Sequence, residues 1–216
     1  VSRARRQFRP DPQAPQTEWV GSSYGGWALP AAGFDADSVC YLAGVGEDVS
    51  FDLALIKCYG CTVHAFDPVP EASAHAGPIA ETEPLFHFHP HGLWSSDTVL
   101  SFHDNPQEGF VSRSATDMHG AAGSLELPVR SIPSVMAELG HERIDLLKLS
   151  VEGSEYELID AIVGEAIPVG CLCVEFAQPT PLDRVRAAVD RLERAGLRLA
   201  HPELRPFYWK FTFLMR

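Results

Sequence analysis

The stretch of sequence that decides the fold is residues 39–68, which read VCYLAGVGEDVSFDLALIKCYGCTVHAFDP. It begins with the apolar run 39–43, which has the length and composition of a buried strand. Gly44 and Gly46 follow at once, and a helical stretch separates them from a second apolar run at 61–66. A strand, a glycine-containing turn, a helix and a second strand form the repeating unit of a parallel α/β sheet.

The rest of the chain continues this alternation of strands and helices. Further strands are expected at 85–93, 99–103, 125–129, 144–151 and 170–176. Helices are expected at 133–139, from Ser154 onward, and at 182–192, where apolar residues recur at helical spacing. The last two strands, at 197–200 and 207–215, are expected to form a hairpin. The sequence therefore predicts an α/β fold, a three-layer Rossmann-like sandwich around a mostly parallel sheet.

The composition excludes several classes of protein. Of the 216 residues, 45% are apolar and 21% charged, as in an ordinary globular domain. There are 17 Lys and Arg against 29 Asp and Glu, and the net charge of −12 argues against a surface for nucleic acid or anionic lipid. No apolar run approaches the roughly 20 residues of a membrane helix. We expect a soluble cytoplasmic protein with no nucleic-acid or membrane partner.

The first residues differ in composition from the remainder. Residues 1–17 are rich in Arg, Gln and Pro and have few apolar side chains, which predicts a flexible arm before a single domain at 18–216. The five cysteines are an odd number and lie in or beside apolar segments, as reduced thiols do. Cys58 and Cys61 have the spacing of a redox or zinc pair, but they straddle the end of a helix, which favours plain packing.

Two features predict a ligand site at the carboxyl ends of the strands, where parallel sheets bind ligands. Gly44 and Gly46 let the backbone turn tightly and approach a ligand closely. Asp67, 21 residues beyond Gly46, is placed to accept hydrogen bonds from the hydroxyls of a ribose. Val49 stands where a dinucleotide fingerprint has its third glycine, which weakens the alternative of a nicotinamide oxidoreductase. A cofactor with ribose and adenine but no phosphates, S-adenosylmethionine (SAM), fits better.

The motifs around these residues resemble the FkbM-type family of SAM-dependent methyltransferases. The resemblance covers about residues 19–214 and rests on Tyr24-Gly25-Gly26-Trp27, Gly44–Asp52, Ala65–Pro68, Leu146–Gly153 and Cys173–Phe176. It implies the class I methyltransferase fold, a seven-stranded sheet whose last strand is antiparallel. It also implies SAM as methyl donor and usually a hydroxyl acceptor, on a sugar, a polysaccharide or a natural product.

The resemblance implies a cofactor site as well. Gly44 and Gly46 would line the methionine side of SAM, and Asp67 would hold the ribose. The candidate cofactor-binding residues are Tyr24, Gly26, Gly44, Gly46, Asp48, Asp67, Pro68, Ser150 and Glu152. The chain departs from the family at Ser150, where an aspartate is common, and at Ala177, where a histidine is frequent. A role that these residues have in relatives is missing or displaced here.

A general base would assist transfer to a hydroxyl. Glu152 and Glu175 are candidates because each follows a buried strand, and His91 is a third. Lys148 and Glu152 lie on one side of their strand, so Glu152 either contacts cofactor or acceptor or pairs with Lys148. The Tyr24–Trp27 loop either covers a sheet edge or folds over the cofactor.

The histidines suggest an alternative function. His87, His89 and His91 alternate along one expected strand, so a straight strand would place all three imidazoles on one face. With His103 they could bind zinc or another divalent metal, which would make the protein a metal-binding or non-catalytic module on the same fold. His89, His91 and His119 are also open as bases. The candidate site includes no metal, and a homodimer remains open.

Overall fold

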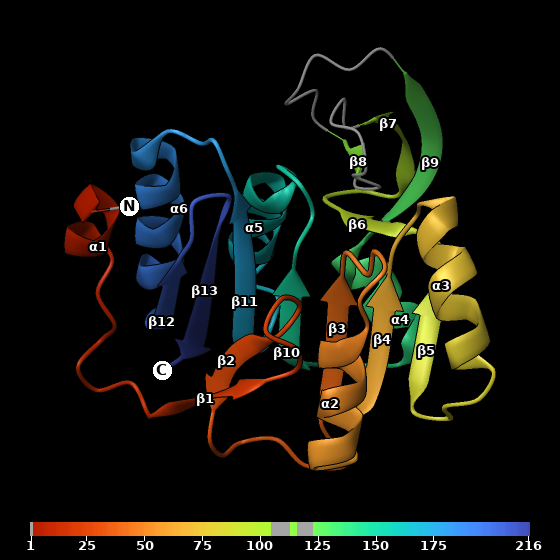
Figure 1. Ribbon diagram of the computed structural model, residues 1–216, viewed down its shortest axis with the longest axis horizontal. Helices are drawn as coiled ribbons and strands as arrows, with labels where there is room; N and C mark the ends of the chain where they lie inside the picture. The colour runs from red at the N-terminus through yellow and green to blue at the C-terminus, as the bar shows by residue number, and fades with distance from the viewer. Residues whose placement is uncertain (1, 105–112, 116–122) are drawn as a thin grey trace.

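The computed structural model describes residues 2–104, 113–115 and 123–216. Its main sheet consists of β3 (Val39–Ala43), β4 (Thr62–Phe66), β5 (Phe86–His89), β10 (Ile144–Leu149), β11 (Val169–Ala177), β12 (Leu197–Leu204) and β13 (Tyr208–Met215). The strand order is β12–β13–β11–β10–β3–β4–β5 (Figure 1). β13 is antiparallel to both of its neighbours, and the other pairs are parallel. This confirms the predicted seven-stranded sheet, its antiparallel last strand and the terminal hairpin.

Helices cover both faces of the main sheet. α2 (Ser50–Tyr59) and α3 (Pro70–Ala80) contribute to one core, together with the hairpin of β1 (Thr17–Val20) and β2 (Trp27–Pro30). α4 (Ile132–Leu139), α5 (Glu155–Gly164) and α6 (Leu182–Arg194) bury their apolar residues in a second core. The apolar stripe predicted for α6 faces this core. The expected three layers are therefore helix, sheet and helix.

Four of the five cysteines pack in the core, as the sequence favours. Cys40, Cys61, Cys171 and Cys173 are buried, whereas Cys58 is exposed. The nearest thiol interaction of Cys61 is with Cys40 on the neighbouring strand, with 3.7 Å between the sulfur atoms. Gly60, with a φ of 69°, ends α2 in the left-handed conformation, which confirms that Cys58 and Cys61 straddle the end of a helix.

The N-terminal segment differs from the flexible arm that its composition predicts. α1 (Ser2–Gln7) lies beside α6 in Figure 1, and Phe8 is only 2% exposed. The Phe8 ring packs edge-on against Trp209 and Phe211, with ring centroids 5.9 Å and 4.9 Å away. Aromatic packing thus holds part of this segment to the domain. The division of the chain at residue 17 stays a prediction.

The segment expected as one strand at 85–93 is divided, and that prediction is wrong. β5 ends at His89, and after Pro90 and His91 the chain begins β6 (Gly92–Trp94) in another sheet. Proline lacks an amide hydrogen and so ends strand pairing. The second sheet has the order β6–β9–β7–β8, with β7 (Thr98–Asp104), β8 (Arg113–Ser114) and β9 (Ser124–Ser131). Figure 1 shows it beyond the carboxyl ends of β3 and β4.

In the described part of the chain, no helix is long and apolar enough to cross a membrane.

Candidate functional site

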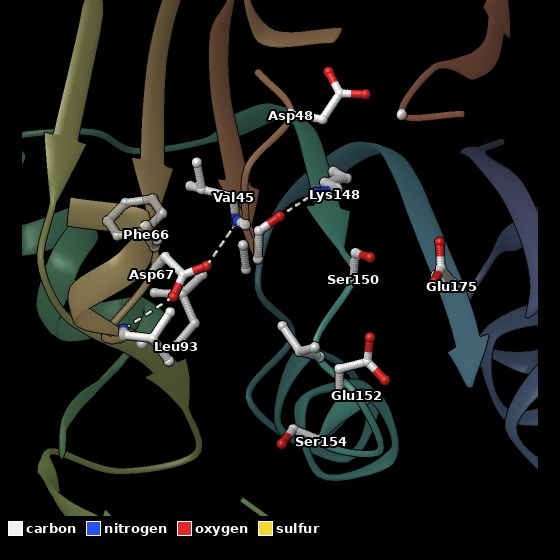
Figure 2. A pocket seen from close by; sticks show the side chains of 18 of the residues that line it. Val45, Asp48, Phe66, Asp67, Leu93, Lys148, Ser150, Glu152, Ser154 and Glu175 are labelled. Carbon is white, nitrogen blue, oxygen red and sulfur yellow. Dashed lines mark hydrogen bonds between the residues drawn. The ribbon is translucent and has the colours of Figure 1, made fainter. Parts of the chain in front are cut away.

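A cavity of about 640 Å³ lies at the carboxyl ends of β3, β4, β10 and β11, where the topology predicts a ligand site. Figure 2 shows Val45, Asp67 and Phe66 on one side of it and Ser150, Glu152 and Glu175 on the other. Of the candidate site residues, those that line the cavity are Tyr24, Gly44, Gly46, Asp48, Asp67, Pro68, Ser150, Glu152 and Glu175. The structure therefore brings together most of the residues that the sequence suggested, although their roles stay predictions.

Gly44 and Gly46 of the first turn favour glycine for different structural reasons. Gly44 has a φ of +83°, and a Cβ built on it would lie 1.8 Å from the carbonyl oxygen of Ser150. The turn passes so close to β10 that a side chain has no room. Gly46 has a φ of +56°, and a Cβ there would meet nothing within 4 Å. Gly46 therefore leaves open space beside the backbone, which suits the close approach of a ligand.

Asp67 holds the glycine turn in place. Its Oδ2 accepts hydrogen bonds from the backbone N–H groups of Val45 at 2.9 Å and Gly46 at 3.0 Å, and its Oδ1 accepts one from Val69 at 3.0 Å (Figure 2). Burial raises the pKa of Asp67, while these three hydrogen bonds favour its ionised form. A carboxylate has about four acceptor positions, so one remains for a ribose hydroxyl. The predicted ribose contact stays a prediction, and the structure adds the role of fixing the turn.

Three residues of the Tyr24–Trp27 loop, Tyr24, Gly25 and Trp27, line the cavity, and the interpretation that the loop folds over the cofactor stays a prediction. Asp48 accepts hydrogen bonds from the Ser22 hydroxyl at 2.9 Å and from the Ser50 N–H at 2.8 Å, which ties the loop to the start of α2. Gly26 does not line the cavity, contrary to its prediction as a cofactor contact. A Cβ on Gly26 would lie 2.4 Å from the Ser22 carbonyl oxygen, so this glycine permits a tight loop.

Glu152 occupies a strained turn between β10 and α5. Its φ is 46°, which is uncommon for a residue with a side chain, and the following Gly153 has a φ of 97°. Burial, together with the negative charge of Glu175, raises the pKa of Glu152 to about 7. The Glu152 carboxylate forms no hydrogen bond or ion pair with another described residue. A carboxylate with a pKa near neutrality is suited to general base catalysis.

Lys148 does not pair with Glu152, so that alternative is wrong. Its ammonium group donates a hydrogen bond to the carbonyl oxygen of Gly44 instead (Figure 2). The reason is the parallel pairing of β10 with β3, which brings Lys148 beside Leu42 and just short of Gly44. Glu175, in contrast, has its ion-pair partner on β13, because the Glu175 Oε2 lies 3.8 Å from the Lys210 Nζ.

The two departures from the family pattern have different surroundings. Burial raises the pKa of Glu175, whereas Lys210, Lys148 and a hydrogen bond with Ser150 lower it. Ser150 thus lies where it can stabilise the ionised form of Glu175. Ala177, at the end of β11, is 8% exposed and is not among the residues that line the cavity. At the start of α5, Glu155 accepts the Gly153 N–H.

The histidines form a stacked cluster outside the cavity. His64 stacks on His87 and His89, with ring centroids 5.0 Å and 5.3 Å away, and its Nδ1 lies 3.1 Å from the His89 Nε2. Burial lowers the pKa of His64 to about 3 and that of His89 to about 4. In the described residues, no group of three or more His, Cys, Asp or Glu is placed to hold a metal ion. The geometry therefore does not support the predicted metal triplet.

His91 is separated from the expected strand and from the cavity. It follows Pro90 in the turn after β5, and its ring faces Phe66 and His89 at 5.5 Å and 5.8 Å. It is not among the described residues that line the cavity, so its position does not favour the predicted catalytic role. His119, the other histidine considered as a base, lies outside the described residues.

Several residues of the site were not found from the sequence. Lys210 donates hydrogen bonds to the carbonyl oxygens of Tyr24 at 2.6 Å and Gly26 at 3.3 Å. Asp52 is buried in the cavity wall, and its Oδ1 has no hydrogen-bond partner in the described part of the chain. Burial raises the pKa of Asp52 to about 6. A lone Lys within an apolar strand was the available signal for Lys210, because such a lysine needs polar partners.

This fold and this cavity define a class I methyltransferase that uses SAM. The family described as "Methyltransferase FkbM domain" matches residues 43–181, so the chain belongs to the FkbM methyltransferase family. No curated protein matches the chain at a significant level.

Two solved structures share the fold. The Methanococcus jannaschii fibrillarin pre-rRNA processing protein is 12% identical, with a TM-score of 0.52, and the match covers 84% of this chain and 67% of that one. Fibrillarin from Aeropyrum pernix, solved with natively bound SAM, is 11% identical, with a TM-score of 0.51 and the same two coverages. At these identities the comparison shows the fold alone.

The described residues of the cavity fit SAM. Of those that line it, seven are acidic and three are basic, which suits a cofactor that carries a positively charged sulfonium. The open space beside Gly46 admits a ligand against the backbone of the glycine turn. The backbone of Gly44 and Gly46 and the carboxylate of Asp67 would hold SAM, which supplies an activated methyl group when bound.

Proposed function

We propose that this protein methylates a hydroxyl group of a sugar, a polysaccharide or a natural product, with Glu152 as the general base. One observation carries the proposal: a carboxylate that faces the cavity from a strained turn, that has no partner among the described residues, and whose pKa is about 7. Side chains held in unfavourable backbone conformations cluster at functional sites.

Methyl transfer leaves the protein three tasks, because the methyl group is already activated. The chain must align the acceptor oxygen, exclude water and accept the hydroxyl proton. The Tyr24 loop lines the cavity and would help to exclude water, and the Glu152 carboxylate accepts the proton. Burial brings the pKa of this base to about 7, and the nearby charge of Glu175 contributes to the shift. A general base of this kind contributes roughly 10²–10⁴-fold.

The fibrillarin fold similarity does not lead us to propose an RNA substrate. The net charge of −12 favours an acceptor other than nucleic acid. The absence of a membrane partner, the cytoplasmic location and a homodimer remain predictions from the sequence.

Calorimetry with S-adenosylhomocysteine tests the cofactor, and label transfer from methyl-tritiated SAM to mixed sugars and hydroxylated natural products tests the reaction. We expect the wild-type protein and Glu152→Gln to bind S-adenosylhomocysteine with affinities within a few-fold, and Asp67→Ala to bind much more weakly. Label should reach a hydroxyl acceptor in the wild type and fall by roughly 10²-fold or more in Glu152→Gln. Equal transfer by the two proteins would contradict the role of Glu152. Absence of S-adenosylhomocysteine binding would contradict the whole proposal.

A further inference from the structure

The cavity has a second end, opposite the glycine turn, which we call the acceptor end. Its residues come from distant parts of the chain, namely Tyr24, Glu152, Glu175, Tyr208 and Lys210. Burial raises the pKa of Tyr24, and so do the negative charges of Glu175, Glu152 and Asp48, which places the tyrosine hydroxyl within electrostatic reach of both glutamates. Lys210 joins these residues, because its Nζ contacts the Tyr24 carbonyl oxygen, lies 3.8 Å from the Glu175 carboxylate and lies 5.0 Å from the centre of the Tyr208 ring.

Each lysine of the cavity wall is already engaged by the protein. Lys210 is 5% exposed, and its ammonium group contacts two loop carbonyl oxygens and the Glu175 carboxylate. Two of its three donor hydrogens go to those carbonyl oxygens, and its charge is paired with the Glu175 carboxylate. The Lys148 ammonium group donates to the Gly44 carbonyl oxygen and is 9% exposed. Lys210 is therefore committed to groups of the protein, whereas Lys148 is held by its hydrogen bond at the glycine turn, the other end of the cavity.

The arginine of the cavity wall is engaged as well. Arg113 forms ion pairs with Glu71 and Asp104, each at 2.7 Å. Residues 105–112 and 116–122 contain no Lys or Arg in the sequence. Phosphate and carboxylate ligands are normally bound by Arg or Lys donors or by a helix N-terminus. Among the described residues of the acceptor end, Lys210 is the one basic side chain, and the N-terminus of α5 beside Glu152 already holds the Glu155 carboxylate, which accepts the Gly153 N–H.

The negative groups of the acceptor end are not neutralised to the same degree. Glu152 has no ion-pair partner among the described residues, and Glu175 has one at 3.8 Å. The field at this end of the cavity is therefore negative once Glu152 is ionised. Like charges brought together in a buried site repel strongly, because the low local dielectric screens them little.

We propose that the acceptor end excludes anions, so that the acceptor is an uncharged hydroxyl compound rather than a phosphorylated or carboxylated one. This inference rests on the proposed function, since it describes the molecule that receives the methyl group. Tyr24, which is 72% exposed at the mouth, and Tyr208 in the wall offer aromatic faces to an uncharged ring. The same negative field favours a positive charge at the point of methyl transfer.

The first experiment measures the sign of the field with two cofactor analogues. Sinefungin carries an ammonium group where SAM carries its reactive methyl group, and S-adenosylhomocysteine carries no charge there. Calorimetry at pH 8 should show sinefungin binding at least tenfold more tightly than S-adenosylhomocysteine. Glu175→Gln and Glu152→Gln should each reduce this preference several-fold. Glu126→Gln, an equal charge change at an exposed residue of β9, should leave it unchanged.

The second experiment compares two acceptor analogues that differ in charge alone. Saturation-transfer NMR on the protein loaded with S-adenosylhomocysteine would compare 4-nitrophenyl glucoside with 4-nitrophenyl glucuronide, whose C6 is a carboxylate. The glucoside should bind roughly 100-fold more tightly, and Glu175→Gln should narrow the difference. Equal binding of both compounds, binding of neither, or no sinefungin preference would overturn the inference. Failure of S-adenosylhomocysteine itself to bind would instead contradict the proposed function.

Discussion

The two ends of the cavity differ in how their polar groups are satisfied. At the cofactor end, Asp67 is 6% exposed and accepts three backbone hydrogen bonds that fix the glycine turn. At the acceptor end, Glu152 sits in a strained conformation with its carboxylate directed into the cavity and unpaired among the described residues. The first arrangement stabilises the fold. The second keeps a reactive group available at some expense in stability, as functional sites commonly do.

The two ends also differ in how far apart their residues are in the sequence. The cofactor end is formed by one strand–turn–helix–strand unit, and Asp67 reaches Gly46 across 21 residues. The acceptor end depends on Lys210, whose contact with the Tyr24 carbonyl oxygen spans 186 residues. Substitutions at the cofactor end should therefore mainly lower the free energy of unfolding. Substitutions at the acceptor end should mainly change the charge of the cavity and the mobility of the Tyr24 loop.

The largest expected effect is that of Gly44→Ala. The new Cβ would overlap the Ser150 carbonyl oxygen in a left-handed backbone conformation, so we expect a loss of about 3–5 kcal/mol in the free energy of unfolding. Gly46→Ala is the matched control, because its backbone is also left-handed but its Cβ meets open space. That control should lose about 1–2 kcal/mol in urea unfolding. Equal losses would show that close packing against β10 is not what requires glycine.

The second effect is that of Asp67→Asn. The variant removes the negative charge and leaves buried N–H groups of the glycine turn without a full set of acceptors, which should destabilise the protein by about 2–4 kcal/mol. The affinity for S-adenosylhomocysteine should fall on the order of 10²-fold, because the turn loses its fixed geometry. Calorimetry and urea unfolding measure the two effects. Asp37→Asn, at an exposed position, should change neither, and an unaltered affinity in Asp67→Asn would remove Asp67 from the site.

The third effect concerns pH and the acceptor end. The pKa of Glu152 rises from 4.5 to about 7 on folding. In the pH range between these two values, the folded state therefore keeps a proton on Glu152 that the unfolded state has released. This contribution makes the wild-type protein less stable as the pH rises through that window. Glu152→Gln removes this pH-dependent contribution. The free energy of unfolding of the variant, relative to that of the wild type, should therefore be about 2 kcal/mol more favourable at pH 8 than at pH 5. Urea unfolding at both pH values checks this, with Glu126→Gln as control. Parallel pH profiles would contradict the raised pKa.

The smallest effect is expected for Lys210→Met. The variant keeps the length of the side chain but removes the donors that hold the Tyr24 and Gly26 carbonyl oxygens. Hydrogen exchange of the amides in residues 22–26 should accelerate about tenfold, because this loop opens locally without unfolding the sheet. Amides of β3 should keep their exchange rates. Uniform acceleration throughout the domain would mean that Lys210 stabilises the whole fold rather than the loop.

The sequence was most informative where the signal is local. Apolar runs, helical spacing and the left-handed Gly60 predicted the order of the main elements, and β3 has the bounds expected for it. The glycine turn and Asp67 were found for the same reason, since one short unit contains them. Composition was less informative at the N-terminus, because the single apolar ring of Phe8 was outweighed by its polar neighbours. The prediction of one strand at 85–93 was wrong, because Pro90 ends the strand pairing despite the apolar pattern around it.

The sequence by itself determined the class of fold and the place of the cofactor site, since strand and helix periods and turn residues are properties of neighbouring positions. Only the tertiary structure decided which partner each charged group has. The pairing of β10 with β3 directed Lys148 to the Gly44 carbonyl oxygen and left Glu152 unpaired, and the pairing of β13 with β11 brought Lys210 to Glu175. These contacts depend on which strands become neighbours and in what register, and neither is encoded in the local spacing of residues.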